Sequence, residues 1–157
     1  MEEYGKVFRK YSLNNSLNVH LEKYNPNDEM YHHVIARMKK EGFKQIIINS
    51  DMMIRILEKT LFSNNFILKI NFTESTDESV IEDVKSLVRN IRKNPVEFVK
   101  LKDLLKWVLD KNSIDISKIE VAVDMKKIDV YSNGLIIGDR IDIFFETIIK
   151  DILEDFL

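Results

Sequence analysis

Two acids and a lysine that could act together lie close to one another late in the chain. They are Glu120, Asp124 and Lys126. Carboxylates bind divalent cations such as Mg²⁺, and a nearby lysine can support the water that attacks a phosphodiester. These three residues are the catalytic candidates of the sequence, and the reaction that they predict is metal-dependent cleavage of DNA or RNA. On any other interpretation we expect no cofactor.

Part of this group resembles the active site of a known family. Restriction-like nucleases carry an acid, one intervening residue and a lysine on a core strand, and Asp124-Met125-Lys126 is similar to that tripeptide. The resemblance covers these three residues and implies a metal-dependent nuclease. Here the tripeptide falls where we expect a turn between strands, and the expected strand order differs from that of the family. The alternative interpretation is an exposed polar turn.

A second candidate is the run of positive charge from Lys85 to Lys111, where eight basic residues stand against three acidic ones. Acidic segments precede and follow it. On a helix, residues three and four positions apart lie on one side, which predicts a strip of cations that binds nucleic-acid phosphates. The predicted nucleic-acid-binding residues are Lys85, Arg89, Arg92, Lys93, Lys100 and Lys106.

The same charges have a simpler interpretation, since amphipathic helices ordinarily carry a solvated charged face. The formal net charge of the whole chain is −2, which is not that of a basic nucleic-acid-binding protein. Trp107 can stack on an exposed base, or it can pack beside Leu104 and Val108. The leading hypothesis is a small binding protein with nucleic acid as the first partner to test.

The remaining residue types leave several classes of site without support. His32 and His33 are adjacent, so on a helix they point about 100° apart and do not converge on one metal. We predict no metal ligands among the histidines. The four glycines form no glycine-rich phosphate loop, and no serine has the setting of a nucleophile elbow. The chain has no cysteine, which excludes disulfides and thiolate zinc sites.

Length and composition predict one folded domain over residues 1–157. Apolar residues make up 45% of the chain and charged residues 32%, which is typical of a globular protein. No apolar run approaches the ~20 residues that span a bilayer, and the first residues lack the pattern of a secretory signal. We therefore expect a cytoplasmic protein without a membrane segment.

The elements that must position these residues follow from hydrophobic periodicity. In the first half we predict a hairpin, a helix that starts at Asn25-Pro26 and closes at Gly42, and a strand–helix–strand unit with parallel strands. Ser50 or Asp51 is the expected cap of the middle helix. The hairpin strands cover 6–13 and 17–24, and the parallel strands cover 43–49 and 66–72.

In the second half we predict two helices, then three strands, then a final helix. Ser75 and Glu78 have capping-box spacing before a helix that runs to about Lys93. Asn94-Pro95 starts another helix, which we prefer to a rival strand over 96–101. A strand meander then covers 118–123, 128–131 and 135–137, and an amphipathic helix runs from Asp139 to the end.

The predicted fold class is therefore α+β, with a mixed sheet and about five helices. The last helix has a wide apolar face that includes Phe144, Phe145 and Phe156. If its own sheet does not cover that face, the remainder is available to a homodimer or another protein. A protein-interaction or regulatory module is thus the third functional hypothesis, beside nucleic-acid binding and the nuclease.

Overall fold

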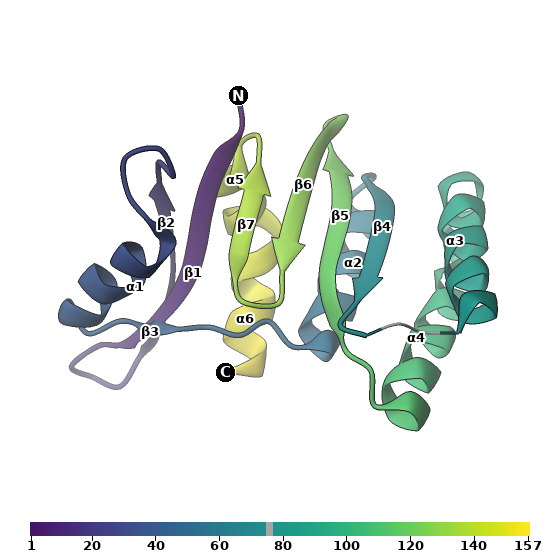
Figure 1. The fold of residues 1–157 in the computed structure, drawn as a ribbon, viewed down its shortest axis with the longest axis horizontal. Helices are drawn as coiled ribbons and strands as arrows, with labels where there is room; N and C mark the ends of the chain where they lie inside the picture. Colours follow the sequence, from purple (N-terminus) through teal and green to yellow (C-terminus); the bar gives the residue numbers. More distant parts are fainter. Residues whose placement is uncertain (75–76) are drawn as a thin grey trace.

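The computed structural model describes residues 1–74 and 77–157 and contains one antiparallel sheet with helices on both faces (Figure 1). The strands are β1 (Glu3–Tyr11), β2 (Leu17–Tyr24), β3 (Lys44–Gln45), β4 (Phe66–Phe72), β5 (Ile116–Val123), β6 (Lys126–Tyr131) and β7 (Leu135–Gly138). Their order is β2-β1-β7-β6-β5-β4, and β3 pairs with β1. The α+β class predicted from the sequence is confirmed.

The helices are α1 (Tyr31–Lys40), α2 (Ser50–Phe62), α3 (Glu78–Lys93), α4 (Phe98–Asn112), and a C-terminal helix built from α5 (Ile141–Phe144), the π-helical η2 (Phe145–Ile149) and α6 (Lys150–Phe156). A 3₁₀ turn, η1 (Pro95–Glu97), leads into α4. Among the described residues no helix is long and apolar enough to cross a membrane.

The N-terminal hairpin is confirmed, but the helix after it begins later than the sequence suggests. Asn25 forms a turn instead of a cap, because its side-chain Oδ1 accepts a hydrogen bond from the N–H of Asn27 at 3.0 Å. α1 starts only at Tyr31. Gly42 follows the helix end with φ of +90°, the left-handed conformation that the sequence predicts for it.

The predicted parallel strand–helix–strand unit is wrong. Of residues 43–49 only Lys44–Gln45 is a strand, and it pairs with β1, whereas β4 pairs with β5. Every strand pairing in the described ranges is antiparallel, so the predicted mixed sheet is absent there. Ile46 and Ile48 are buried, but their N–H groups bond to Val7 of β1 and to Ser132, so the segment crosses the end of the sheet.

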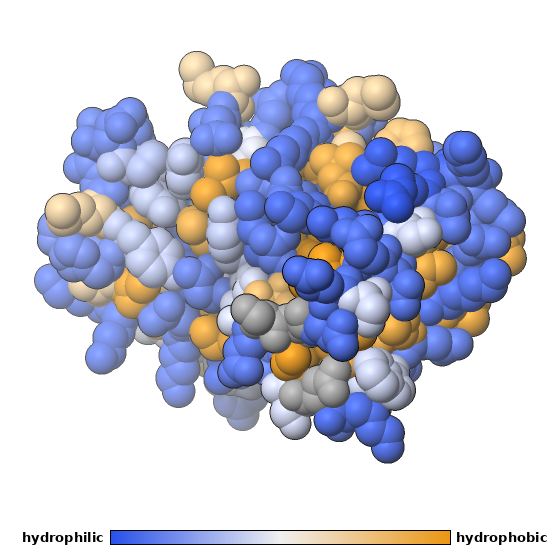
Figure 2. Space-filling view, turned by 45° about the vertical axis from the view of Figure 1, so that its right-hand side comes forward, coloured by the Kyte–Doolittle hydropathy of each residue, from blue (hydrophilic) through white to orange (hydrophobic). Residues whose placement is uncertain are grey.

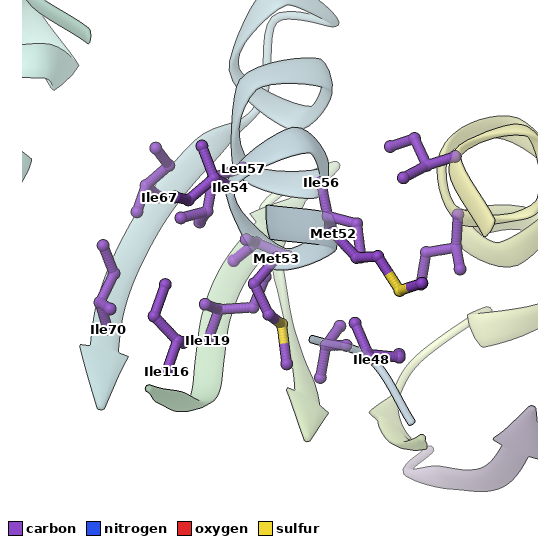
Figure 3. Packing of buried hydrophobic residues seen from close by; sticks show 14 of the residues in the cluster. Ile48, Met52, Met53, Ile54, Ile56, Leu57, Ile67, Ile70, Ile116 and Ile119 are labelled. Carbon is purple, nitrogen blue, oxygen red and sulfur yellow. The ribbon is translucent and has the colours of Figure 1, made fainter. Parts of the chain in front are cut away.

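α2 covers the sheet at β4 and β5 and carries much of the core. Its cap is Asn49, whose side chain accepts a hydrogen bond from the N–H of Met52 at 2.9 Å, one residue earlier than predicted. Figure 3 shows Met53 and Leu57 of α2 packed toward the isoleucines of these two strands. α1 packs on the other face, where Val34 and Met38 form a separate cluster with Phe8.

The second half of the chain follows the predicted order of helices and strands. α3 ends at Lys93, and Pro95 starts the turn into α4, so the rival strand over 96–101 is wrong. The meander is confirmed as β5, β6 and β7. α3 is capped by Asp77, which accepts a hydrogen bond from the N–H of Ser79; the expected cap Ser75 lies outside the described residues.

Most of the apolar face of the C-terminal helix is covered by the protein itself. Phe144 and Phe145 are 1% and 3% exposed, and they belong to the main core. Phe156 is 39% exposed and lies beside the guanidinium of Arg55, 5.8 Å from its ring centre. Only the far end of the predicted partner-binding face is therefore open.

Candidate functional site

A groove of about 620 Å³ lies between β4 and α3. Figure 1 shows α3 beyond β4, on the side of this strand away from β5. β4 lines the groove with Leu68, Lys69, Ile70, Asn71 and Phe72, and Glu74 follows the end of this strand; α3 lines it with Ile81, Val84, Lys85, Val88, Arg89 and Arg92. It combines an apolar floor with charged side chains.

The strand side of the groove is the edge of the sheet. β4 is the last strand in the order, and in residues 1–74 and 77–157 it pairs only with β5. The pairing shifts between Ile67 and Lys69, so a bulge at Leu68 separates two stretches of regular register. Ile70 then points into the core, while Lys69 lies opposite Glu120 on the other face.

The helix side combines a buried stripe with a basic flank. Val84 and Val88 are 3% and 4% exposed and pack into the core. Lys85, Arg89 and Arg92 follow one another at spacings of four and three residues, so they share the flank beside that stripe and line the groove. Figure 2 views the molecule with this side turned forward, and apolar patches show there between hydrophilic side chains.

Positive charge dominates the rim of the groove. Lys69, Lys85, Arg89 and Arg92 line it with one acid, Glu74. Lys85 has a loose pairing with Glu82 at 3.9 Å, in which both side chains are more than half exposed. No ion pair engages Arg89 or Arg92 in the part of the chain that the structure describes. The groove therefore presents cations that a ligand can contact.

The groove lining contains three of the six predicted nucleic-acid-binding residues. Lys85, Arg89 and Arg92 line the groove together, whereas Lys93, Lys100 and Lys106 are exposed and do not line it. Lys100 is paired with Glu97 at 3.6 Å. Trp107, 48% exposed on α4, also lies outside the groove lining.

The sequence interpretation missed Lys69. The signal for it is a lysine inside a run that the sequence predicts as an interior strand, because edge strands commonly carry lysine and interior strands do not. Lys69 lies in the site because β4 is the last strand of the sheet. A local sequence pattern does not indicate which strand is last.

The three catalytic candidates are not brought together. Lys127 contacts Glu120 at 2.9 Å, and neighbouring residues of a strand point to opposite faces, so Lys126 lies on the other face from Glu120. Lys126 is instead paired with Asp139 at 2.6 Å. That hydrogen bond holds the pKa of the Asp139 carboxyl below its ordinary value.

Asp124 belongs to the tight turn between β5 and β6. It and Met125 have positive φ angles of 51° and 67°, and the Asp124 N–H donates to Asn65 Oδ1 at 3.3 Å. Asp124 and Lys126 line a small cavity of about 190 Å³ together with Asp139 and Arg140. Within the described ranges, no group of three or more histidine and acidic side chains is arranged to hold a metal ion.

Glu120 belongs to a charge cluster that neutralises itself on the sheet face opposite α2. It lies directly across from Asp129, and Lys118 and Lys127 contact both carboxylates at 2.9–3.7 Å. Burial raises the pKa of Glu120, but the hydrogen bond from Lys127 and the charges of the lysines outweigh it, leaving the pKa below its ordinary value. This arrangement stabilises the ionised form of the Glu120 carboxyl.

Comparisons with known proteins do not identify this arrangement: no protein-family model, curated protein or solved structure matches the chain.

Proposed function

We propose that the protein is a non-catalytic interaction module that binds an acidic, extended segment of a partner protein in the groove between β4 and α3. The observation that carries this proposal is the placement of Lys69, Lys85, Arg89 and Arg92 around an apolar floor. Binding sites for short segments commonly combine an apolar surface with a few polar groups that fix orientation and specificity.

The floor supplies affinity and the rim supplies selectivity. Leu68, Phe72 and Ile81 line the groove with partly exposed apolar side chains, against which apolar groups of a ligand are removed from water. Arginine binds carboxylates through two parallel hydrogen bonds, so Arg89 and Arg92 favour an acidic ligand. The site thus fits a segment that carries both apolar and acidic side chains.

The charges around the groove favour a short acidic peptide over a long polyanion. Glu74 lines the groove, and four exposed acids occupy the cap and first turns of α3: Asp77, Glu78, Glu82 and Asp83. A nucleic acid carries a phosphate at every nucleotide and would meet these carboxylates as it left the basic rim. Nucleic-acid binding stays a prediction, and the same experiment tests it.

The experiment compares two variants with equal changes of charge. Fluorescence anisotropy measures binding of a labelled acidic peptide with apolar residues, a basic control peptide, and single-stranded DNA and RNA. In the groove variant Arg89→Glu/Arg92→Glu, we expect the acidic peptide to lose about tenfold or more in affinity. In the control variant Lys100→Glu/Lys106→Glu, whose charges lie outside the groove lining, we expect nearly unchanged peptide affinity.

Two results would overturn the proposal. One is an acidic peptide that binds no better than the basic peptide. The other is DNA or RNA that binds more tightly than the peptide and is weakened equally by both variants, which would assign the function to the general basic surface.

A further inference from the structure

The edge of β4 that borders the groove has unused backbone hydrogen-bonding groups. In an antiparallel strand, alternate residues direct their N–H and C=O groups to opposite sides. β5 satisfies one side of β4, and no other strand pairs with it in residues 1–74 and 77–157. The residues of this edge, from Leu68 to Phe72, line the groove.

We infer that the partner segment binds as an additional strand, hydrogen-bonded through its backbone to β4. This inference rests on the proposed function and specifies its partner. A free strand edge beside a helix provides main-chain hydrogen bonds that give affinity. The side chains of the groove contact the side chains of the incoming strand and so give specificity. The sheet would then extend by one strand into the groove between β4 and α3.

The positions of the groove side chains set the sequence pattern of this strand. Lys69 lies on the face of the sheet that carries Glu120, and Ile70 lies on the opposite, core-facing side. Side chains of an added strand alternate between the same two faces. Acidic residues of the added strand would therefore lie on the face of Lys69, while the intervening residues would lie on the apolar side of the groove, toward Ile70. The partner segment alternates acidic and apolar residues.

A second observation concerns Asn71, which also lines the groove. Its Oδ1 is buried and has no hydrogen-bond partner in the described part of the chain. An unsatisfied buried acceptor costs free energy, and a donor that reached it would recover that cost.

Charge excludes a second copy of this chain as the favoured occupant. Pairing of two β4 edges would bring Lys69, Lys85, Arg89 and Arg92 of one copy toward the same four cations of the other. Like charges placed opposite one another destabilise strand pairing. An acidic segment meets the same rim with opposite charge.

Four synthetic peptides with the same numbers of glutamate and valine residues test the inference against the intact protein. The first alternates glutamate and valine, and the second has the glutamates and valines in two blocks. The third and fourth repeat the alternating sequence with N-methyl groups on the odd or the even residues. N-methylation removes the donors on one edge of a strand and leaves those on the other edge.

We expect the alternating peptide to bind about tenfold more tightly than the block peptide, and one methylated peptide to lose binding while the other keeps it. Backbone amides in Leu68–Phe72 should then exchange hydrogen more slowly in the complex. If all four peptides bind equally, strand addition is wrong and the proposed function stands as electrostatic capture. If none of the four binds, the proposed function itself is refuted, and this inference with it.

Discussion

Ser50 and Asp115 join the start of α2 to the start of β5. Ser50 Oγ donates a hydrogen bond to Asp115 Oδ1 at 2.9 Å and accepts one from the N–H of Ile116, also at 2.9 Å. Ser50 is 6% exposed and Ile116 is 1% exposed. One hydroxyl therefore satisfies two groups at the point where the helix meets the sheet.

Removal of this hydroxyl should destabilise the fold. We expect Ser50→Ala to lower the free energy of unfolding by about 1–3 kcal/mol, because it leaves the buried N–H of Ile116 without an acceptor. Ser63→Ala is the control: its exposed hydroxyl bonds only to the carbonyl of Lys59, so a change within about 0.5 kcal/mol is expected. Urea denaturation measures both, and equal losses would contradict the role of Ser50.

Lys6 should make stability depend on pH in the alkaline range. Its side chain is fully buried, and its Nζ donates to the carbonyl of Asn133. Burial lowers the pKa of Lys6 to about 8 from its ordinary value of 10.5. Below pH 8 the amine is charged in both the folded and unfolded states, and the folded state bears the cost of desolvating it.

As the pH rises from about 8 to about 10.5, the folded state releases this proton before the unfolded state does, so stability increases. The full effect is about 3 kcal/mol. In Lys6→Met we expect this increase to disappear, whereas the exposed-lysine control Lys40→Met should keep it. Urea denaturation across this range measures the free energy of unfolding of each variant and of wild type. The difference between the two removes the contribution of the other titrating groups. A parallel pH dependence in wild type and Lys6→Met would contradict the assignment.

Two glycines with similar backbone angles should respond differently to alanine. Gly134 has φ of +86°, and a Cβ there would lie 2.6 Å from the carbonyl oxygen of Ile46. Gly42 has φ of +90°, but its Cβ would meet only the flexible end of Lys10 at 3.4 Å. Both variants incur backbone strain of about 1 kcal/mol or more, and Gly134→Ala should lose about 2 kcal/mol beyond Gly42→Ala. Equal losses in thermal or chemical unfolding would show that the contact with Ile46 relaxes freely.

The nuclease hypothesis has a direct test. Because Glu120 and Lys126 lie on opposite faces of the sheet, we expect no Mg²⁺- or Mn²⁺-dependent degradation of labelled DNA or RNA. Asp124→Ala should leave any trace of degradation unchanged, with circular dichroism to verify the fold. Cleavage that requires the cation and is lost in Asp124→Ala would restore the hypothesis.

Local sequence patterns predicted which residues are buried better than which strands pair. Ile46 and Ile48 are buried as expected, yet Ile47 is 63% exposed, and the segment bonds to two different parts of the sheet. Three consecutive isoleucines indicate burial and β propensity, but they carry no information about the partner strand. The antiparallel order therefore could not be read from them.

The site was predictable to the extent that it lies on one helix. Spacings of three and four placed Lys85, Arg89 and Arg92 together, because helical geometry is local. Lys69 lies beside them but belongs to a strand. Lys100 and Lys106 belong to the next helix along the chain and lie outside the groove lining. Those relationships depend on tertiary packing, which spacing along the chain does not determine.

The pairing of β1 with β7 joins Glu3–Lys6 to Leu135–Gly138. During synthesis these early residues leave the ribosome roughly ten seconds before their partners exist, at typical elongation rates. For that interval β2 pairs with one side of β1, and on the other side β3 pairs only with Phe8 and Arg9, so the stretch that β7 later covers stays open. The nascent chain is consequently the state in which wrong pairing with neighbouring polypeptides is easiest, and molecular chaperones would have most to protect there.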